Sequence, residues 1–171
     1  MKKLFLALIA ASIASGAAAY AADEKPKPAK VTNEDALKLA VALRNLDGHA
    51  ASVKNNGQDA VIMIPWDFGS ASLRLRIAND LTIAAAVERS VTEARSATFK
   101  ELIRKAGVKE LAAGTKERED YEKQDRALLD EAAPGSQDLA RIKVSELKLD
   151  KNEIAVTVIE ALRPILDDDT R

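Results

Sequence analysis

The residue types that most often carry catalysis are scarce in this chain. It contains one histidine, His49, and no cysteine. A single imidazole with no thiolate excludes the His- and Cys-rich sites that zinc and copper prefer, and it excludes thiol chemistry. A Ser-His-Asp triad would need His49 as its base. Serines such as Ser52 and Ser70 stand in no GxSxG-like turn, so we interpret His49 as structural.

Carboxylates are plentiful, and a pair of them could support glycoside hydrolysis. Glu88, Glu93 and Glu101 lie off the apolar stripe of the long helix predicted below. Basic residues surround them, so we expect surface ion pairs rather than an acid–base pair. These basic residues are Arg89, Arg95, Arg104 and Lys105.

Two other acidic stretches suggest a divalent metal ion at first sight, and the first of them suggests calcium. The segment "DKNE" at residues 150–153 begins like a calcium loop. Its fifth, sixth and twelfth positions hold Ile154, Ala155 and Ala161 instead of a ligand, a glycine and a closing glutamate. Residues 167–169, "DDD", are interpreted as part of a solvated acidic tail, 167–171. No phosphate-binding glycine loop is present, and the sequence predicts no catalytic residue, cofactor site or metal site.

The segment "IPWDFG" at residues 64–69 is the strongest candidate for binding. Trp66 and Phe68 point to the same side of an extended chain, and paired aromatics near a surface are typical anchors for protein partners. Only 4% of the chain is aromatic, so a core also needs these rings. We favour a core plug where the sheet meets the long helix, and keep partner binding by Trp66, Phe68, Arg74 and Arg76 as the alternative.

The first 21 residues predict a secretory signal peptide. Lys2 and Lys3 precede the apolar residues 4–13, and Ala19-Tyr20-Ala21 supplies small residues for cleavage between Ala21 and Ala22. An uncleaved anchor is the alternative, but the leucine-rich part is about half of the roughly 20 residues that a spanning helix needs. No cysteine follows to carry a lipid. We expect a periplasmic protein of a Gram-negative bacterium that meets the membrane only transiently, through this signal.

The remaining chain is long enough for one domain, predicted at residues 32–166 after a disordered tether at 22–31. The formal net charge of the full 171-residue chain is −1, with 26 basic and 27 acidic residues intermixed. Such a balance does not indicate nucleic-acid binding. Without cysteine, packing alone must hold the fold in an oxidising compartment.

The pattern predicts a first helix capped by Thr32 or Asn33 and ended by Asp47-Gly48. Two strands at 50–53 and 60–64 follow, joined by a hairpin loop at 54–59. Residues 61–64 are apolar without alternation, so we expect this strand to be covered on both faces. Pro65 should end its pairing.

One long helix is predicted from Ser70 to Ala106, with Gly107 ending it. Its apolar residues recur every three or four positions. The stretch "SLRLRI" at 72–77 also alternates strictly, so a third strand followed by a shorter helix capped at Asn79-Asp80 is the alternative.

Residues 115–133 predict a polar helix that leans on the long helix through Tyr121, Leu128 and Ala132. Residues 141–149 predict a strand with a bulge near Ser145-Glu146. A last apolar helix should be capped by Asp150 or Asn152 and ended or kinked by Pro164.

The order of motifs resembles small uncharacterised proteins of tailed phages and prophages. The matching segments are "ALRNLDG" (42–48), "IPWDFG" (64–69), "RLRIANDL" (74–81) and "LKLDKNEI…ALRPIL" (147–166). The resemblance implies a mixed helical architecture and carries no activity or catalytic residue. The signal peptide departs from that group and puts a virion-related role in doubt.

The sequence therefore predicts an α+β fold, mainly α, in which a long amphipathic helix and a helical hairpin pack with a small antiparallel β-sheet. The leading function is a non-enzymatic exported interaction or structural protein with an unknown protein partner, and with homodimerisation through the long helix. A chaperone-like holdase or inhibitor that binds apolar segments is the alternative, and a carboxylate-dependent hydrolase is less favoured.

Overall fold

The computed structural model describes residues 30–55 and 58–169. The predicted signal peptide, most of the tether and the two residues of the hairpin turn lie outside the described residues.

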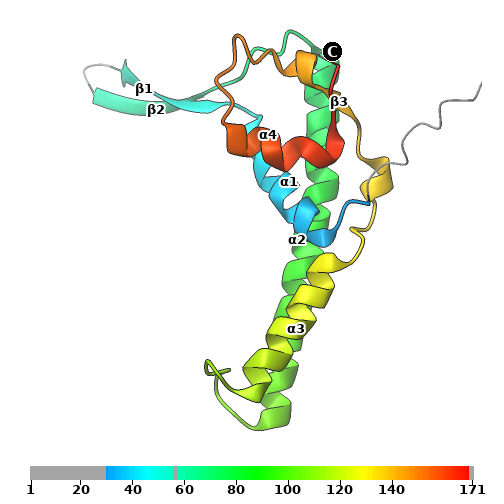
Figure 1. Ribbon diagram of the computed structural model, residues 1–171. Coiled ribbons are helices and arrows are strands. Elements are labelled where there is room, and N and C mark those ends of the chain that lie inside the picture. Colours follow the sequence, from blue (N-terminus) through cyan, green and yellow to red (C-terminus); the bar gives the residue numbers. More distant parts are fainter. Residues whose placement is uncertain (1–29, 56–57, 170–171) are drawn as a thin grey trace, which may run out of the picture.

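Three helices build the body. Helix α1 (Asn33–Asn45) packs against the first half of α2 (Ala71–Ala106) and against the short α4 (Val156–Leu162), as Figure 1 shows. Helix α1 begins where predicted: the Asp35 amide donates to Thr32 Oγ1 at 3.2 Å, and the Thr32 amide donates to Asp35 Oδ2 at 3.0 Å. This reciprocal box satisfies two donors at the helix end. The largest fully buried apolar side chains are Leu39, Leu43, Leu46, Leu73, Ile142, Leu147, Leu162 and Ile165.

Helix α2 has 36 residues and is about 54 Å long. The Leu73 amide donates to Ser70 Oγ at 3.3 Å at its start, and Gly107 ends it in the left-handed region at φ 67°. Only glycine adopts this conformation without a Cβ penalty. The prediction of one continuous helix is confirmed, and the alternative of a strand at 72–77 is wrong.

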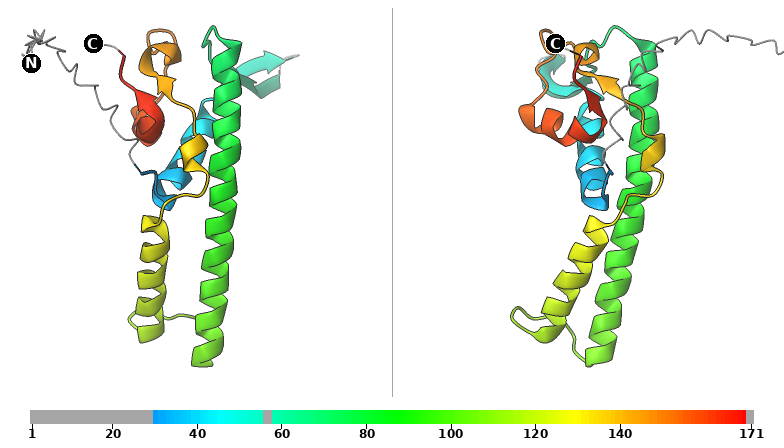
Figure 2. Two further views of the ribbon diagram at one scale, coloured as in Figure 1. Left: turned by 90° about the vertical axis from the view of Figure 1, so that its right-hand side faces the viewer. Right: turned by 45° about the vertical axis from the view of Figure 1, so that its right-hand side comes forward.

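Helix α3 (Lys116–Asp130) runs antiparallel to the distal half of α2, and the two form an arm that extends from the body (Figure 2). The predicted helical hairpin is therefore present. Every α3 side chain keeps some exposure. Arg95 Nε donates to Asp125 Oδ1 at 2.5 Å and its Nη2 to Asp125 Oδ2 at 3.0 Å, which joins the two helices. A second apolar cluster lies where the arm meets the body, at Val31, Ala36, Val87, Val91 and Ala133.

Strands β1 (His49–Asn55) and β2 (Gln58–Ile64) pair antiparallel over their full length and project from the body as a ribbon (Figure 1). The connection is shorter than the predicted loop. The expectation that β2 is covered on both faces is wrong, because Val61 is 73% exposed and Met63 62%. An apolar run resembles a buried strand in the sequence, but none of the helices among residues 30–55 and 58–169 covers this one.

The segment after α3 differs from the predicted strand. A short 3-10 turn, η1 (Ser136–Asp138), leads to β3 (Ile142–Lys143), which pairs parallel with β4 (Leu166–Asp167). A 3-10 turn, η2 (Val144–Leu147), follows at once. The tight turn changes the direction of the side chains, so Ile142 and Leu147 both reach the core without a bulge.

The end of the chain also needs correction. Helix α4 begins after Ala155 with no side-chain cap, so neither Asp150 nor Asn152 caps it. Pro164 lies in a final 3-10 turn, η3 (Arg163–Ile165). Within the predicted acidic tail, Asp167 is part of β4, and Ser145 donates to the Asp169 carboxylate from its amide at 3.0 Å and its hydroxyl at 2.5 Å, while both aspartates stay exposed.

The fold is α+β and mainly α, as predicted, but its antiparallel strands stand beside the core rather than within it. Among the described residues, none of the helices has the length and hydropathy to cross a membrane.

Candidate interaction surface

The segment that joins the ribbon to α2 carries the predicted binding residues. Trp66 is half-buried at the base of the ribbon. Its Nε1 donates to the Asn45 carbonyl at 2.9 Å, and its ring lies 4.5 Å from the His49 ring, centroid to centroid. The hydrogen bond joins the base of the ribbon to the end of α1, and the ring contact joins the segment after β2 to the first residue of β1. His49 is therefore a packing partner of Trp66.

Phe68 lies inside the core cluster and is 2% exposed. The Arg74 guanidinium sits 5.7 Å from the centre of its ring and also donates to the Trp66 carbonyl. A cation over a ring face is attracted by the ring quadrupole. Phe68 is thus packed in the core, as the favoured interpretation predicted, and the Arg74 guanidinium covers its ring.

Arg76 connects α2 to the C-terminal segment. It donates to the Arg141 carbonyl at 2.8 Å and forms an ion pair with Glu146. The hydrogen bond from Arg76 is the main cause that lowers the pKa of Glu146. All four predicted residues thus make contacts within the chain, and partner binding by them stays a prediction.

Asn152 fixes this segment, whereas the sequence pattern predicted it as a possible helix cap. It is 3% exposed. Its Oδ1 accepts from the Asp67 amide at 3.0 Å, and its Nδ2 donates to the carbonyls of Leu147 at 2.8 Å and Asp67 at 3.2 Å. Through these hydrogen bonds, the side chain holds the 66–69 loop against the loop that precedes α4.

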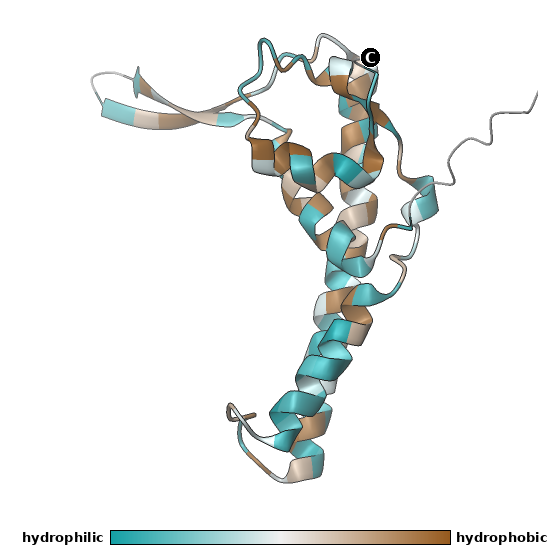
Figure 3. Cartoon of the chain, in the orientation of Figure 1, coloured by the Kyte–Doolittle hydropathy of each residue, from teal (hydrophilic) through white to brown (hydrophobic). Residues whose placement is uncertain are grey.

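The ribbon is apolar on both faces. The register places Ala51 opposite Ile62 on one face, and Ala50 opposite Met63 on the other. Val61, the most exposed of the four apolar residues that end β2, lies opposite Ser52 on that second face. Figure 3 shows the ribbon away from the brown core of the body, with apolar and polar residues along it. Monomeric proteins rarely expose a contiguous apolar surface of this kind unless it is functional.

Both edges of the ribbon are open in the part of the chain that the structure describes, since β1 and β2 form a two-stranded sheet. The opposite charges of Lys54 and Asp59 face each other toward the tip. An open strand edge offers unpaired amides and carbonyls to another chain.

Two of the three carboxylates considered for hydrolysis, Glu88 and Glu101, form ion pairs with basic side chains. Both Glu88 oxygens accept from Arg44 of α1, and Glu101 lies 2.6 Å from Lys105 Nζ. The hydrogen bonds from these cations lower the pKa of both glutamates, which makes them poor proton donors. Among residues 30–55 and 58–169, no three histidines or carboxylates gather into a site that could hold a metal ion.

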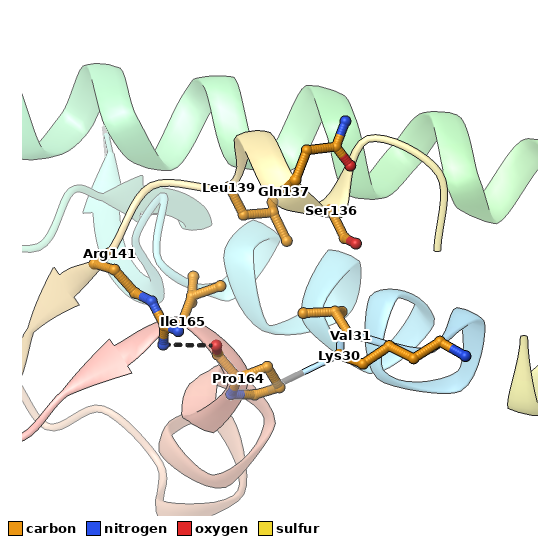
Figure 4. Close-up of a pocket in the computed structure, with 8 residues that line it drawn as sticks. All are labelled: Lys30, Val31, Ser136, Gln137, Leu139, Arg141, Pro164 and Ile165. Atoms are coloured by element: carbon orange, nitrogen blue, oxygen red, sulfur yellow. Dashed lines mark hydrogen bonds between the residues drawn. The ribbon is translucent and has the colours of Figure 1, made fainter. Parts of the chain in front are cut away.

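Figure 4 shows a cavity of 390 Å³ between the start of the described chain, η1 and η3. Arg141 crosses it and donates to the Pro164 carbonyl at 3.0 Å. A further cavity of 430 Å³ lies between α1 and α2, beside Phe68 and Arg74. The linings combine apolar side chains with cations, and neither brings together an acid and a base suited to catalysis.

Asp80 is a buried residue that the sequence reading considered only as a helix cap. It is 0% exposed, and its Oδ1 accepts from the Ala140 amide at 2.8 Å. Its Oδ2 has no hydrogen-bond partner within the described residues. Burial raises the pKa of this carboxyl. The signal in the sequence was an aspartate within the apolar stripe, between Ile77 and Ala84.

Comparison of this chain with protein-family models, with curated proteins and with solved structures found no match.

Proposed function

We propose that this chain is an exported, non-enzymatic protein-binding module whose binding element is the β1–β2 ribbon. One observation carries the proposal: four consecutive apolar residues end β2, and they are exposed on a ribbon whose edges are open. Their exposed fractions are 73%, 44%, 62% and 38% for Val61, Ile62, Met63 and Ile64. Strand edges with alternating apolar side chains bind extended segments through main-chain hydrogen bonds and side-chain pockets.

The attachment of the ribbon supports this role, because a binding element is more effective when its position is fixed. Trp66 bonds to the end of α1, and Asn152 holds the following loop. Gly48, which precedes β1 at this same base, leaves no room for a side chain, since a Cβ there would lie 2.4 Å from the Ile64 carbonyl oxygen. The base is tightly packed while the strands stand in solvent.

Export is proposed from the arrangement of residues 1–21, with a charged start, an apolar stretch and a small-residue cleavage site. Fractionation of a Gram-negative host and N-terminal sequencing test this part. We expect a periplasmic product that begins at Ala22, and a product that retains Met1 in the cytoplasm contradicts it.

Binding is tested with a photo-crosslinking residue at Ser52, on the exposed face beside Val61, and with the same residue at Lys123 on the polar helix α3 as control. We expect adducts from position 52 in intact cells, reduced by Val61→Lys, and few from position 123. Equal yields from both positions, or none from position 52, contradict the ribbon as binding element.

A holdase for unfolded chains is the second candidate, favoured by Met63, a flexible side chain that adapts to varied apolar surfaces. Suppression of the aggregation of a chemically denatured model protein tests it. A holdase suppresses aggregation near equimolar ratio and loses this effect with Val61→Lys. Absence of suppression by the wild-type chain excludes it.

A further inference from the structure

We propose that the ribbon binds a second copy of this chain: β2 pairs antiparallel with β2 of the second copy about a twofold axis, which creates a four-stranded sheet. This inference rests on the proposed function and names the partner of the same surface. It differs from a dimer through the long helix, because α2 already packs against α1 and α3 along its length.

The ribbon lacks the support that two strands normally need. An isolated two-stranded hairpin is marginally stable in water, and a third strand or a packed helix is usually required. Here the extensive contacts of β1 and β2 are those between the two strands themselves. A second ribbon beside the first supplies the missing strands and covers apolar side chains on both faces.

The charges favour β2 as the joining edge. In β2 the only charged residue is Asp59, toward the tip, and the five residues that follow it are apolar. Strand β1 carries Lys54, and edge lysines oppose pairing with another strand. The edge of β1 is therefore protected, while the edge of β2 is open and apolar.

One register makes β2 complementary to itself. With the twofold axis at Ile62, each Val61 lies opposite Met63 of the second copy, and each Ala60 lies opposite Ile64. Asp59 then lies opposite Pro65, which lacks an amide and ends the ladder. No like charges face each other. A shift of the axis to Val61 would instead place Asp59 against Met63.

The shape of the molecule allows this approach. The ribbon projects away from the helices in Figure 1 and in the left-hand view of Figure 2. Because the two β2 strands run in opposite directions, the helical bodies lie at opposite ends of the new sheet.

The contact is small. It joins about five residues of β2 from each copy and leaves the bodies apart, which is below the standard interface of about 1,600 Å². We therefore expect a reversible dimer with a dissociation constant of roughly tens of micromolar, at the weak end of specific association.

The experiment is sedimentation equilibrium of the chain from Ala22, up to about 0.5 mM, well above the expected dissociation constant. The perturbing variant is Val61→Lys and the matched control is Leu75→Lys, because both side chains are 73% exposed and only Val61 is on the ribbon. We expect wild type and the control to dimerise alike, and Val61→Lys to weaken dimerisation at least tenfold.

The register is tested by disulfide formation, which is unambiguous because the natural chain has no cysteine. Ile62→Cys places two thiols across the axis, within the Cα separation that a disulfide spans. Ile64→Cys places them too far apart. We expect oxidation to yield a covalent dimer from the first variant and little from the second.

A chain that stays monomeric up to about 0.5 mM overturns the inference. So does equal disulfide formation at positions 62 and 64, or loss of the dimer with Leu75→Lys alone. A monomer whose Ser52 crosslinker still captures another protein overturns the second copy as partner and leaves the proposed binding function intact. A monomer without such adducts removes both.

Discussion

Substitution of Asn152 distinguishes two roles for its side chain: a buried link between two loops, or a helix cap. The side chain makes three hydrogen bonds at 2.8–3.2 Å and is 3% exposed. With about 0.5–1.5 kcal/mol for each bond, Asn152→Ala should lower the free energy of unfolding by about 2–4 kcal/mol. This is a large part of the 5–15 kcal/mol typical of a domain.

Asn152→Asp is the sharper test. An aspartate keeps the acceptor for the Asp67 amide, but its second oxygen faces the carbonyls of Leu147 and Asp67, to which the amide now donates. An ionised carboxylate buried against two carbonyls is strongly disfavoured, so at pH 7 this variant should be at least as unstable as Asn152→Ala. Its pKa should be raised, and stability should return as the pH falls through that raised value, because the protonated acid can donate.

Urea unfolding at pH 7 and at pH 5, with an unchanged m-value, measures both effects. Asp150→Ala is the control, since Asp150 is exposed and should change stability by less than about 0.5 kcal/mol. Aspartate and asparagine are about equally good helix caps. If Asn152→Asp is as stable as wild type at pH 7, the side chain does not act as a buried link between the two loops, and the role of helix cap is favoured again.

Three further predictions concern the body and the arm. Asp80→Asn should be more stable than wild type at neutral pH, because burial raises the pKa of this carboxyl above its ordinary 3.8. Folding favours the protonated form of Asp80. The greater stability of Asp80→Asn should therefore grow as the pH rises through the raised pKa and vanish below 3.8. Thermal unfolding of both proteins between pH 3 and 7 measures this difference. Gly48→Ala should cost about 1–3 kcal/mol in denaturant unfolding, because the new Cβ meets the backbone of Ile64. Asp125→Asn should cost about 1 kcal/mol or less, since the ion pair with Arg95 is partly exposed, and hydrogen exchange should show the loss of protection in the arm with α1 unchanged.

Local patterns located the long elements correctly. The recurrence of apolar residues every three or four positions identified α2, with Ser70 and Gly107 at its ends. The cap of α1 is Thr32, one of the two residues predicted for that position. These features depend on neighbours within one or two turns, so a sequence window contains the information that decides them.

Burial was less well predicted, because it depends on which elements cover one another. The run "VIMI" reads as a strand buried on both faces, yet it is the most exposed apolar part of the described chain after pairing only with β1. Asn152 reads as a cap, and its partners lie 5 and 85 residues away in the sequence. Asp80 was considered only as the cap of an alternative, shorter helix, and it is fully buried beside the 139–141 segment.

The sequence by itself determined the positions of α1, α2 and α3, the ends of α2, the presence of the β-hairpin and the scarcity of catalytic residue types. Only the tertiary structure decided that the ribbon stands outside the core, that Phe68 is inside it, and that Asn152 joins two distant loops. The physical reason is that backbone propensity and capping act over a few residues, whereas solvent exposure is set by the packing of segments far apart in the chain.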